Sequence, residues 1–239
     1  LASRASPTDF GEHPLEVALA NTDGTRGVLA FADDVEARVV FSSTSEVYGD
    51  PERHPQDEGY NGNVDPQGSR ACYKEAKRFG EALTSIYRRQ RDVDVRVARI
   101  FNTYGPRMRP DDGRVVPTFL SQALDDKPLT VHGDGSQTRS FLYVDDLVLG
   151  LRALMAHEEH DGTPVNVGST DEVTIRRLAE TVIEIVGADS HIRYEERPDG
   201  DADRRCPDTT RARRVLDWEP TIGLREGIRR ILRHDDRAP

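Results

Sequence analysis

The segment Tyr73-Lys74-Glu75-Ala76-Lys77 places a tyrosine and a lysine four residues apart. In a helix, residues with this spacing lie on the same face, so both side chains are expected to point the same way. A nearby ammonium group favours a phenolate and lowers the pKa of a phenol. A tyrosine adjusted in this way can remove a proton from a sugar hydroxyl near neutral pH. The pattern is short and common, and two unrelated surface residues would produce it equally well.

Polar side chains also follow two predicted strands at the point where each strand ends. Hydroxyls and a carboxylate, Ser42 to Glu46, come directly after one short apolar run, and Asn102 follows another. In an open α/β sheet, ligands bind beyond the carboxyl ends of the strands. We therefore expect these groups to meet the tyrosine–lysine pair in one crevice, although a polar turn would explain either strand end alone.

Helix and strand patterns alternate along the first 110 residues, which predicts an α/β fold with a Rossmann-like parallel sheet. Shorter elements follow, so we place the Rossmann-like domain at 1–110 and a smaller α/β substrate domain at 111–239. The strand at 165–168 is expected to return to the first sheet. The expected helices are 15–32, 69–90, 115–124, 144–155 and 174–186, and the expected strands are 38–41, 95–100, 129–131 and 165–167.

The composition argues against several classes of protein. The chain has 239 residues, and its net charge of -10 leaves no evident basic face for nucleic acid. No apolar run is long enough for a membrane segment. Only two cysteines are present, far apart, and no metal-ligand spacing occurs. We therefore expect free thiols, no metal site and a cytoplasmic location.

Longer motifs occur in a fixed order along the chain. S-T-S-E-V-Y-G is followed by Y-x-x-x-K, then R-I-F-N-T-Y-G-P-R, and later by DDGRVVPTFLSQAL, PLTVHGDGSQTRSFLYVDDLV and VNVG. This order resembles the extended short-chain dehydrogenase/reductase family, whose members are NAD-dependent epimerases and dehydratases. Within it, the pattern is most similar to the UDP-glucuronate decarboxylases. The resemblance covers essentially the whole chain.

The resemblance implies an internal redox cycle on a UDP-sugar. NAD oxidises carbon 4 of UDP-glucuronate, with Tyr73 as the base and Lys77 lowering its pKa. The 4-keto sugar is a β-keto acid and loses carbon dioxide, after which the hydride returns to carbon 4 and gives UDP-xylose. The cofactor carries the hydride, while the protein supplies orientation and proton control.

The residues after the first strand help to choose among reactions in this family. By resemblance, Thr44 hydrogen-bonds near the carbon-4 oxygen. Dehydratases that eliminate water carry aspartate-glutamate after this threonine, whereas this chain has Ser45 and Glu46. Four-epimerases usually lack the glutamate. We therefore favour decarboxylation, with Glu46 orienting the sugar or managing protons at carbon 5, over the alternatives of a 4-epimerase or a 4,6-dehydratase.

The same resemblance assigns the remaining site residues. Arginine suits phosphate because its planar guanidinium bonds two oxygens at once, although a solvated surface charge is the default reading for any one arginine. The implied cofactor residues are Leu1, Ala2, Ser3, Ser42, Tyr73, Lys77, Thr103 and Arg114. The implied substrate residues are Asn102, Val131, Gln137, Arg139 and Arg205, of which the last two hold the diphosphate.

The family's glycine-rich turn, G-x-x-G-x-x-G, is not found in these 239 residues. That turn binds the cofactor pyrophosphate, and about three preceding strands are expected to be missing with it. A non-catalytic protein that binds a sugar nucleotide is therefore a further alternative. The resemblance also implies a homodimer through the Tyr73/Lys77 helix and the helix before it, with Leu83, Ile86 and Tyr87 as candidate contacts.

Overall fold

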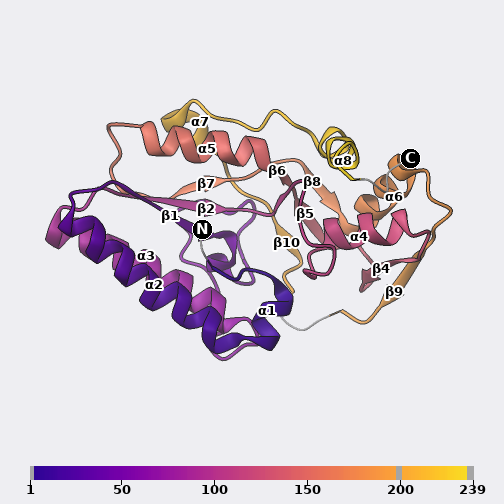
Figure 1. Cartoon of the computed structure of the whole chain (residues 1–239), viewed down its shortest axis with the longest axis horizontal. Coiled ribbons are helices and arrows are strands. Elements are labelled where there is room, and N and C mark those ends of the chain that lie inside the picture. Colours follow the sequence, from indigo (N-terminus) through magenta and orange to yellow (C-terminus); the bar gives the residue numbers. More distant parts are fainter. Residues whose placement is uncertain (1–2, 198–200, 236–239) are drawn as a thin grey trace.

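The first structural half of the protein combines the N-terminal elements with segments from residues 144–216. It is a parallel sheet between two layers of helices (Figure 1). The computed structural model describes residues 3–197 and 201–235, so the predictions for Leu1 and Ala2 fall outside the described residues. The strands lie in the order β1-β2-β7 and are all parallel. They are β1 (Val39–Thr44), β2 (Val95–Ile100) and β7 (Val165–Val167). The predicted α/β class is confirmed, and the strand near residue 165 pairs with β2 as expected.

Helices α2 and α3 cover one face of this sheet, and α5 and α7 cover the other (Figure 1). Phe41 and Val97 of the sheet pack against Leu29 of α2, which gives the first face its apolar core. Gly80 of α3 sits directly against Phe41, and the missing side chain lets the helix approach the strand. The helices are α2 (Pro14–Asp34), α3 (Ala71–Arg91), α5 (Val144–Ala156) and α7 (Thr210–Leu216).

The second half consists of small sheets packed on three helices. Its core gathers apolar residues from all three helices, such as Phe119, Leu178 and Ile228. The sheets are β10-β5-β8, β3-β6 and β4-β9. The helices are α4 (Val115–Leu124), α6 (Ile175–Val186) and α8 (Leu224–Leu232). The strands are β3 (Thr103–Tyr104), β4 (Leu129–His132), β5 (Thr138–Ser140), β6 (Leu142–Tyr143), β8 (Glu172–Thr174), β9 (Ile192–Glu195) and β10 (Arg204–Arg205).

Two short elements complete the chain near the sheet. Helix α1 (Pro7–Glu12) begins at Ser6, whose hydroxyl accepts a hydrogen bond from the Asp9 amide at 3.2 Å. A 3₁₀ turn, Ser45–Tyr48, follows β1 directly, and the Thr44 hydroxyl caps it by accepting from the Glu46 amide at 3.2 Å. These caps satisfy amides that have no partner inside the helical turn. Both elements lie at the carboxyl end of β1.

Side-chain groupings that would indicate another class of protein are not found in the described part of the chain. Cys72 and Cys206 are free thiols, as expected. Residues 3–197 and 201–235 hold no cluster of three or more histidine, cysteine, aspartate or glutamate side chains arranged for a metal ion. Over the same residues, no helix has both the length and the hydrophobicity needed to cross a bilayer. The division into domains at residue 110 and the cytoplasmic location stay predictions.

Candidate active site

Nearly all of the predicted site residues that the structure describes line one cavity of about 680 Å³. The cavity lies at the carboxyl ends of β1 and β2, beside the first turns of α3. Side chains from β5 and β10 of the second half form its other wall. The predicted residues that line it are Ser3, Ser42, Thr44, Glu46, Tyr73, Lys77, Asn102, Thr103, Arg114, Gln137, Arg139 and Arg205.

Val131 is the exception among the described residues: it does not line the cavity, and its predicted contact with the substrate stays a prediction. Its side chain is fully buried in the core of the second half. Thr130 and His132, the residues on either side, line the cavity instead. Successive side chains of a strand point to opposite faces, so β4 cannot direct all three toward the ligand.

Tyr73 and Lys77 point toward the same part of the cavity, as their spacing on α3 predicts. The Lys77 ammonium donates to the backbone carbonyl of Ser42 at 2.8 Å and lies 5.7 Å from the centre of the Tyr73 ring. The ring of Phe10, from α1, stacks on Tyr73 with centroids 4.8 Å apart. Packing on both sides fixes the tyrosine ring close to the end of β1.

Burial acts on the protonation of both members of this pair. Burial raises the pKa of Tyr73 to about 12, and a hydrogen bond with Thr44 offsets only part of that effect. Burial lowers the pKa of Lys77 to about 8. Desolvation is therefore the largest influence on the pKa of Tyr73 in this arrangement, and its expected lowering by Lys77 stays a prediction.

Glu46 stands at the centre of a cluster of positive side chains. A guanidinium nitrogen of Arg205 bonds its Oε1, and Arg70 lies 4.0 Å from the same oxygen. The Lys74 ammonium lies 3.9 Å from Oε2. Burial acts to raise the pKa of Glu46, but these three cations together hold it below its ordinary value. One carboxylate among three cations leaves a net charge of +2 at this end of the cavity.

Sequence reasoning missed two members of this cluster. Arg70 and Lys74 lie four residues apart at the start of α3, on either side of Tyr73. The helical spacing was a usable signal, since residues four apart share a helix face. Arg205 was expected at the diphosphate, whereas here it contacts Glu46 and donates to the Gly49 carbonyl at 3.3 Å. Its role toward a diphosphate stays a prediction.

The other predicted arginines are held by aspartates. Arg139, from β5, donates to Asp201 at 2.6 Å and to the Thr138 carbonyl at 2.7 Å. Arg114 donates to Asp112 at 2.7 Å. Asp201, which lines the cavity, was not predicted, because nothing in the charged loop around it distinguishes it from its neighbours. A phosphate at Arg139 would replace or extend this aspartate contact.

The amide and hydroxyl residues of the site are fixed by the backbone. Gln137 donates to the His132 carbonyl at 2.7 Å, and the Thr103 hydroxyl donates to the Phe101 carbonyl at 3.0 Å. The backbone carbonyl of Asn102 accepts from the Leu142 amide at 2.8 Å, which joins the end of β2 to the second half. The last of these bonds ties the two walls of the cavity together.

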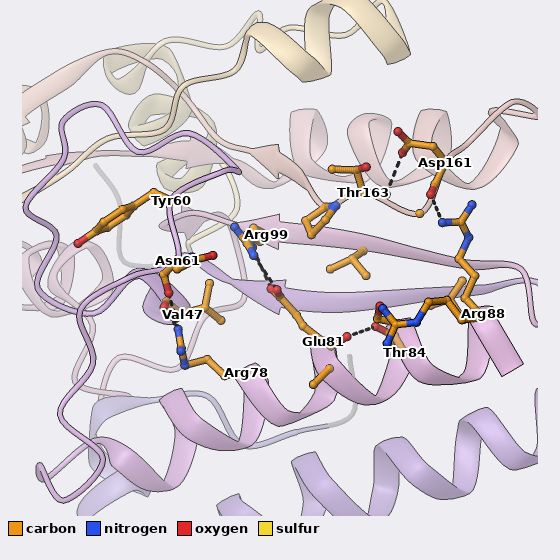
Figure 2. Close-up of a pocket in the computed structure, with 17 residues that line it drawn as sticks. Val47, Tyr60, Asn61, Arg78, Glu81, Thr84, Arg88, Arg99, Asp161 and Thr163 are labelled. Carbon is orange, nitrogen blue, oxygen red and sulfur yellow. Dashed lines mark hydrogen bonds and ion pairs between the residues drawn. The ribbon is translucent and has the colours of Figure 1, made fainter.

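A second cavity, of about 590 Å³, lies along α3 and contains none of the predicted site residues (Figure 2). Most of its charged side chains are bonded to other residues of the cavity wall. Glu81 and Arg99 lie 2.7 Å apart, and Arg78 donates to the Asn61 carbonyl at 2.6 Å. Arg88 likewise bonds the Asp161 carbonyl. The cavity at the strand ends is therefore the stronger candidate for chemistry.

Comparison with known proteins identifies the family. The family model described as GDP-mannose 4,6 dehydratase matches residues 1–231. The chain belongs to this family. The relationship agrees with the resemblance to extended short-chain dehydrogenases/reductases, and the solved structures that match include epimerases and a dehydratase.

Curated relatives resemble the chain over nearly all of its length. It is 47% identical over 237 residues to UDP-glucuronic acid decarboxylase 1 of Danio rerio, covering 99% of the chain and 56% of the relative. It is 50% identical over 228 residues to UDP-glucuronic acid decarboxylase 5 of Arabidopsis thaliana, covering 95% and 66%. The chain thus spans about half to two thirds of the length of these curated relatives.

A solved structure with a bound nucleotide sugar shares the fold. The Bacillus cereus UDP-glucuronic acid 4-epimerase, in complex with UDP-glucuronic acid and NAD, matches with a TM-score of 0.84 at 25% identity. The match covers 97% of this chain and 73% of the epimerase chain. The Rossmann-like prediction is therefore confirmed.

Proposed function

We propose that the protein carries the catalytic site of an NAD-dependent UDP-glucuronate decarboxylase, which forms UDP-xylose through a 4-keto intermediate. The observation that carries the proposal is the Glu46 cluster, placed beside Thr44 and Tyr73. Its net charge of +2 suits a sugar that bears a carboxylate, because a neutral sugar would offer these cations only its diphosphate as a counter-ion. The 47–50% identity to UDP-glucuronic acid decarboxylases supports the same reading.

Tyr73 would exchange a proton with the carbon-4 oxygen of the sugar. It lies beside Thr44, whose hydroxyl would hold that oxygen, and it would take a proton in the oxidation and return it in the reduction. A phenol with a pKa near 12 is a weak acid, so the base form needs extra positive charge. Lys77 supplies part of that charge, and a bound nicotinamide cation would supply more.

The carboxylate end of the sugar would face Arg70, while Arg205 would keep its predicted role toward the diphosphate. Loss of carbon dioxide would break the bond between carbon 5 and the carboxylate carbon. The electron pair of that bond would move onto the carbon-4 oxygen, where the Tyr73 hydroxyl would stabilise it. A proton is then added at carbon 5. Ser45 is buried next to Glu46 and carries no carboxylic acid that could protonate a leaving hydroxyl, which disfavours a 4,6-dehydratase.

The residues present fit one half of NAD. Ser42, Tyr73, Lys77 and Thr103 offer hydroxyl and ammonium donors in the same cavity, as the ribose and nicotinamide amide require. When bound there, the cofactor would accept a hydride from carbon 4 and give it back. UDP binding without NAD binding would instead indicate the second candidate function, a non-catalytic sugar-nucleotide-binding protein.

We also propose a homodimer through α2 and α3. Large apolar side chains on these two adjacent helices are exposed, among them Leu15, Phe31 and Phe79 at 50–67%. Exposed apolar faces of this kind mark protein interfaces. Ile86 belongs to this surface, whereas Leu83 and Tyr87 pack into the core beneath α3 and are less suited to the contact.

The test is product analysis with UDP-glucuronate and NAD. We expect carbon dioxide and UDP-xylose from the wild-type protein, and no turnover from Tyr73→Phe, which should bind UDP unchanged. A 4-epimerase would instead give UDP-galacturonate, and UDP-glucose would be turned over by a 4-epimerase of neutral sugars. Wild-type turnover in Tyr73→Phe would remove Tyr73 from the proposed role.

A further inference from the structure

Lys74 is a buried lysine that the proposed reaction does not yet use. It directly follows Tyr73 on α3, and its side chain is only 11% exposed. Within the described part of the chain, its one ion pair is with Glu46, at 3.9 Å. A buried ammonium group is costly unless a partner compensates for it, so this position calls for an explanation beyond a solvated surface charge.

Glu46 presents two different oxygens to its surroundings. Oε1 accepts from Arg205, while Oε2 is buried and has no hydrogen-bond partner among the described residues. Lys74 is the cation paired with that second oxygen. The carboxylate is therefore held between Arg205 on β10 and Lys74 on α3, which join the two halves of the protein at the cavity.

Other charged or titratable groups also act on this carboxylate or on the lysine. Arg70 faces Oε1 at 4.0 Å, and Tyr73 and Arg139 interact with Glu46 electrostatically. Asp50 interacts with Lys74. Burial lowers the pKa of Lys74, and Glu46 opposes that effect. The two side chains therefore keep each other charged.

We propose that Lys74 is a positioning residue of the proposed decarboxylase site, whose buried ammonium holds the Glu46 carboxylate in place so that Glu46 can orient the Arg205 guanidinium toward the substrate. The inference rests on the proposed function only for the identity of that substrate. The pairing of Lys74 with Glu46 can be measured without any turnover.

The lysine content of the chain makes a direct test possible. Lys74, Lys77 and Lys127 are its only lysines, so a protein labelled with ¹³C at the lysine Cε gives three signals, each assigned by substitution. The chemical shift of each signal followed against pH gives the titration midpoint of that lysine. In Glu46→Gln we expect the titration midpoint of Lys74 to fall by at least about one pH unit, because the negative charge 3.9 Å from its ammonium is removed. Lys127, which pairs with Asp125 on the surface, should not move and serves as the internal control.

The reciprocal test replaces the lysine. Lys74→Met should raise the Glu46 midpoint, observed by ¹³C-labelled glutamate, by at least about one pH unit, and Lys74→Arg should restore it. The Arg205 Nε–H signal should be sharp in the wild-type protein and in Lys74→Arg, and broadened in Lys74→Met. Lys127→Met is the matched control and should leave the Lys74, Glu46 and Arg205 signals unchanged.

Each outcome decides the inference. A shift of less than about one pH unit in the titration midpoint of Lys74 or of Glu46 in the respective variants would overturn it. An unchanged Arg205 signal in Lys74→Met would overturn it as well. If Lys74→Met does not fold, the Glu46→Gln measurement on Lys74 still decides the pairing. Failure of decarboxylation with these shifts present would contradict the proposed function and leave the pairing intact.

Discussion

Replacing Glu46 by glutamine should destabilise the folded protein strongly, although the two side chains have the same shape. Glu46 compensates Arg205, whose side chain is 4% exposed, and Lys74, which is 11% exposed. The substitution leaves three cations crowded together with no counter-ion. Removing one partner of a buried ion pair costs about 3–5 kcal/mol, and we expect a loss in that range.

Urea unfolding at pH 7 measures this loss directly. The matched control is Glu226→Gln, because Glu226 bonds Arg230 at 2.9 Å but is 41% exposed. An exposed pair contributes less than about 1 kcal/mol, so the control should be nearly neutral. Adding Lys74→Met to Glu46→Gln should recover part of the lost stability, since it removes one uncompensated cation.

The stabilisation by Glu46 should also depend on pH in a definite direction. The pKa of Glu46 in the folded protein lies below the ordinary value of 4.5. The stabilisation from its charge is therefore fully present above about pH 4.5 and is lost as the pH falls through the folded pKa. The difference between wild type and Glu46→Gln should be constant from pH 6 to 8 and shrink in acid. A loss no larger than that of Glu226→Gln at pH 7 would refute the reasoning.

Three further predictions concern α3 and its neighbours. Burial lowers the pKa of Lys77 to about 8 from 10.5. The free energy of unfolding of the wild type, relative to that of Lys77→Met, should therefore rise by up to about 3 kcal/mol between pH 8 and 10.5. A difference in urea unfolding that does not change with pH would contradict this. Gly80→Ala should cost about 1–3 kcal/mol in the same assay, because its Cβ would lie 2.4 Å from Phe41; an unchanged midpoint would show that the helix can shift. Phe31→Glu should convert a dimer into a monomer in light scattering, whereas Val148→Glu, exposed on α5, should not; two dimers would exclude the α2–α3 contact.

Much of the fold was predictable because local patterns dictate it. The helix at 115–124 and the strand at 95–100 appear with their predicted bounds, and α2 extends the predicted 15–32 by one residue at its start and two at its end. The Tyr73–Lys77 spacing fixed their common face through helix geometry alone. The convergence of Thr44 and Asn102 followed from the rule that parallel strands end at the same edge.

The protonation of the site could not be predicted from spacing. The sequence suggests that Lys77 lowers the pKa of Tyr73, but the folded chain buries both groups and bonds the ammonium to Ser42. Desolvation depends on everything packed around a group, including Phe10 from a distant segment. No local pattern records that environment.

The sequence by itself determined which residues could do chemistry, because motif order and helix and strand periodicity are local properties of the chain. Only the tertiary structure decided that Arg205, 159 positions from Glu46, closes on that carboxylate opposite Lys74. It also decided that Val131 faces the core while Thr130 and His132 face the cavity. Charge pairing and burial arise when remote segments meet, so their strength is set by packing and not by spacing.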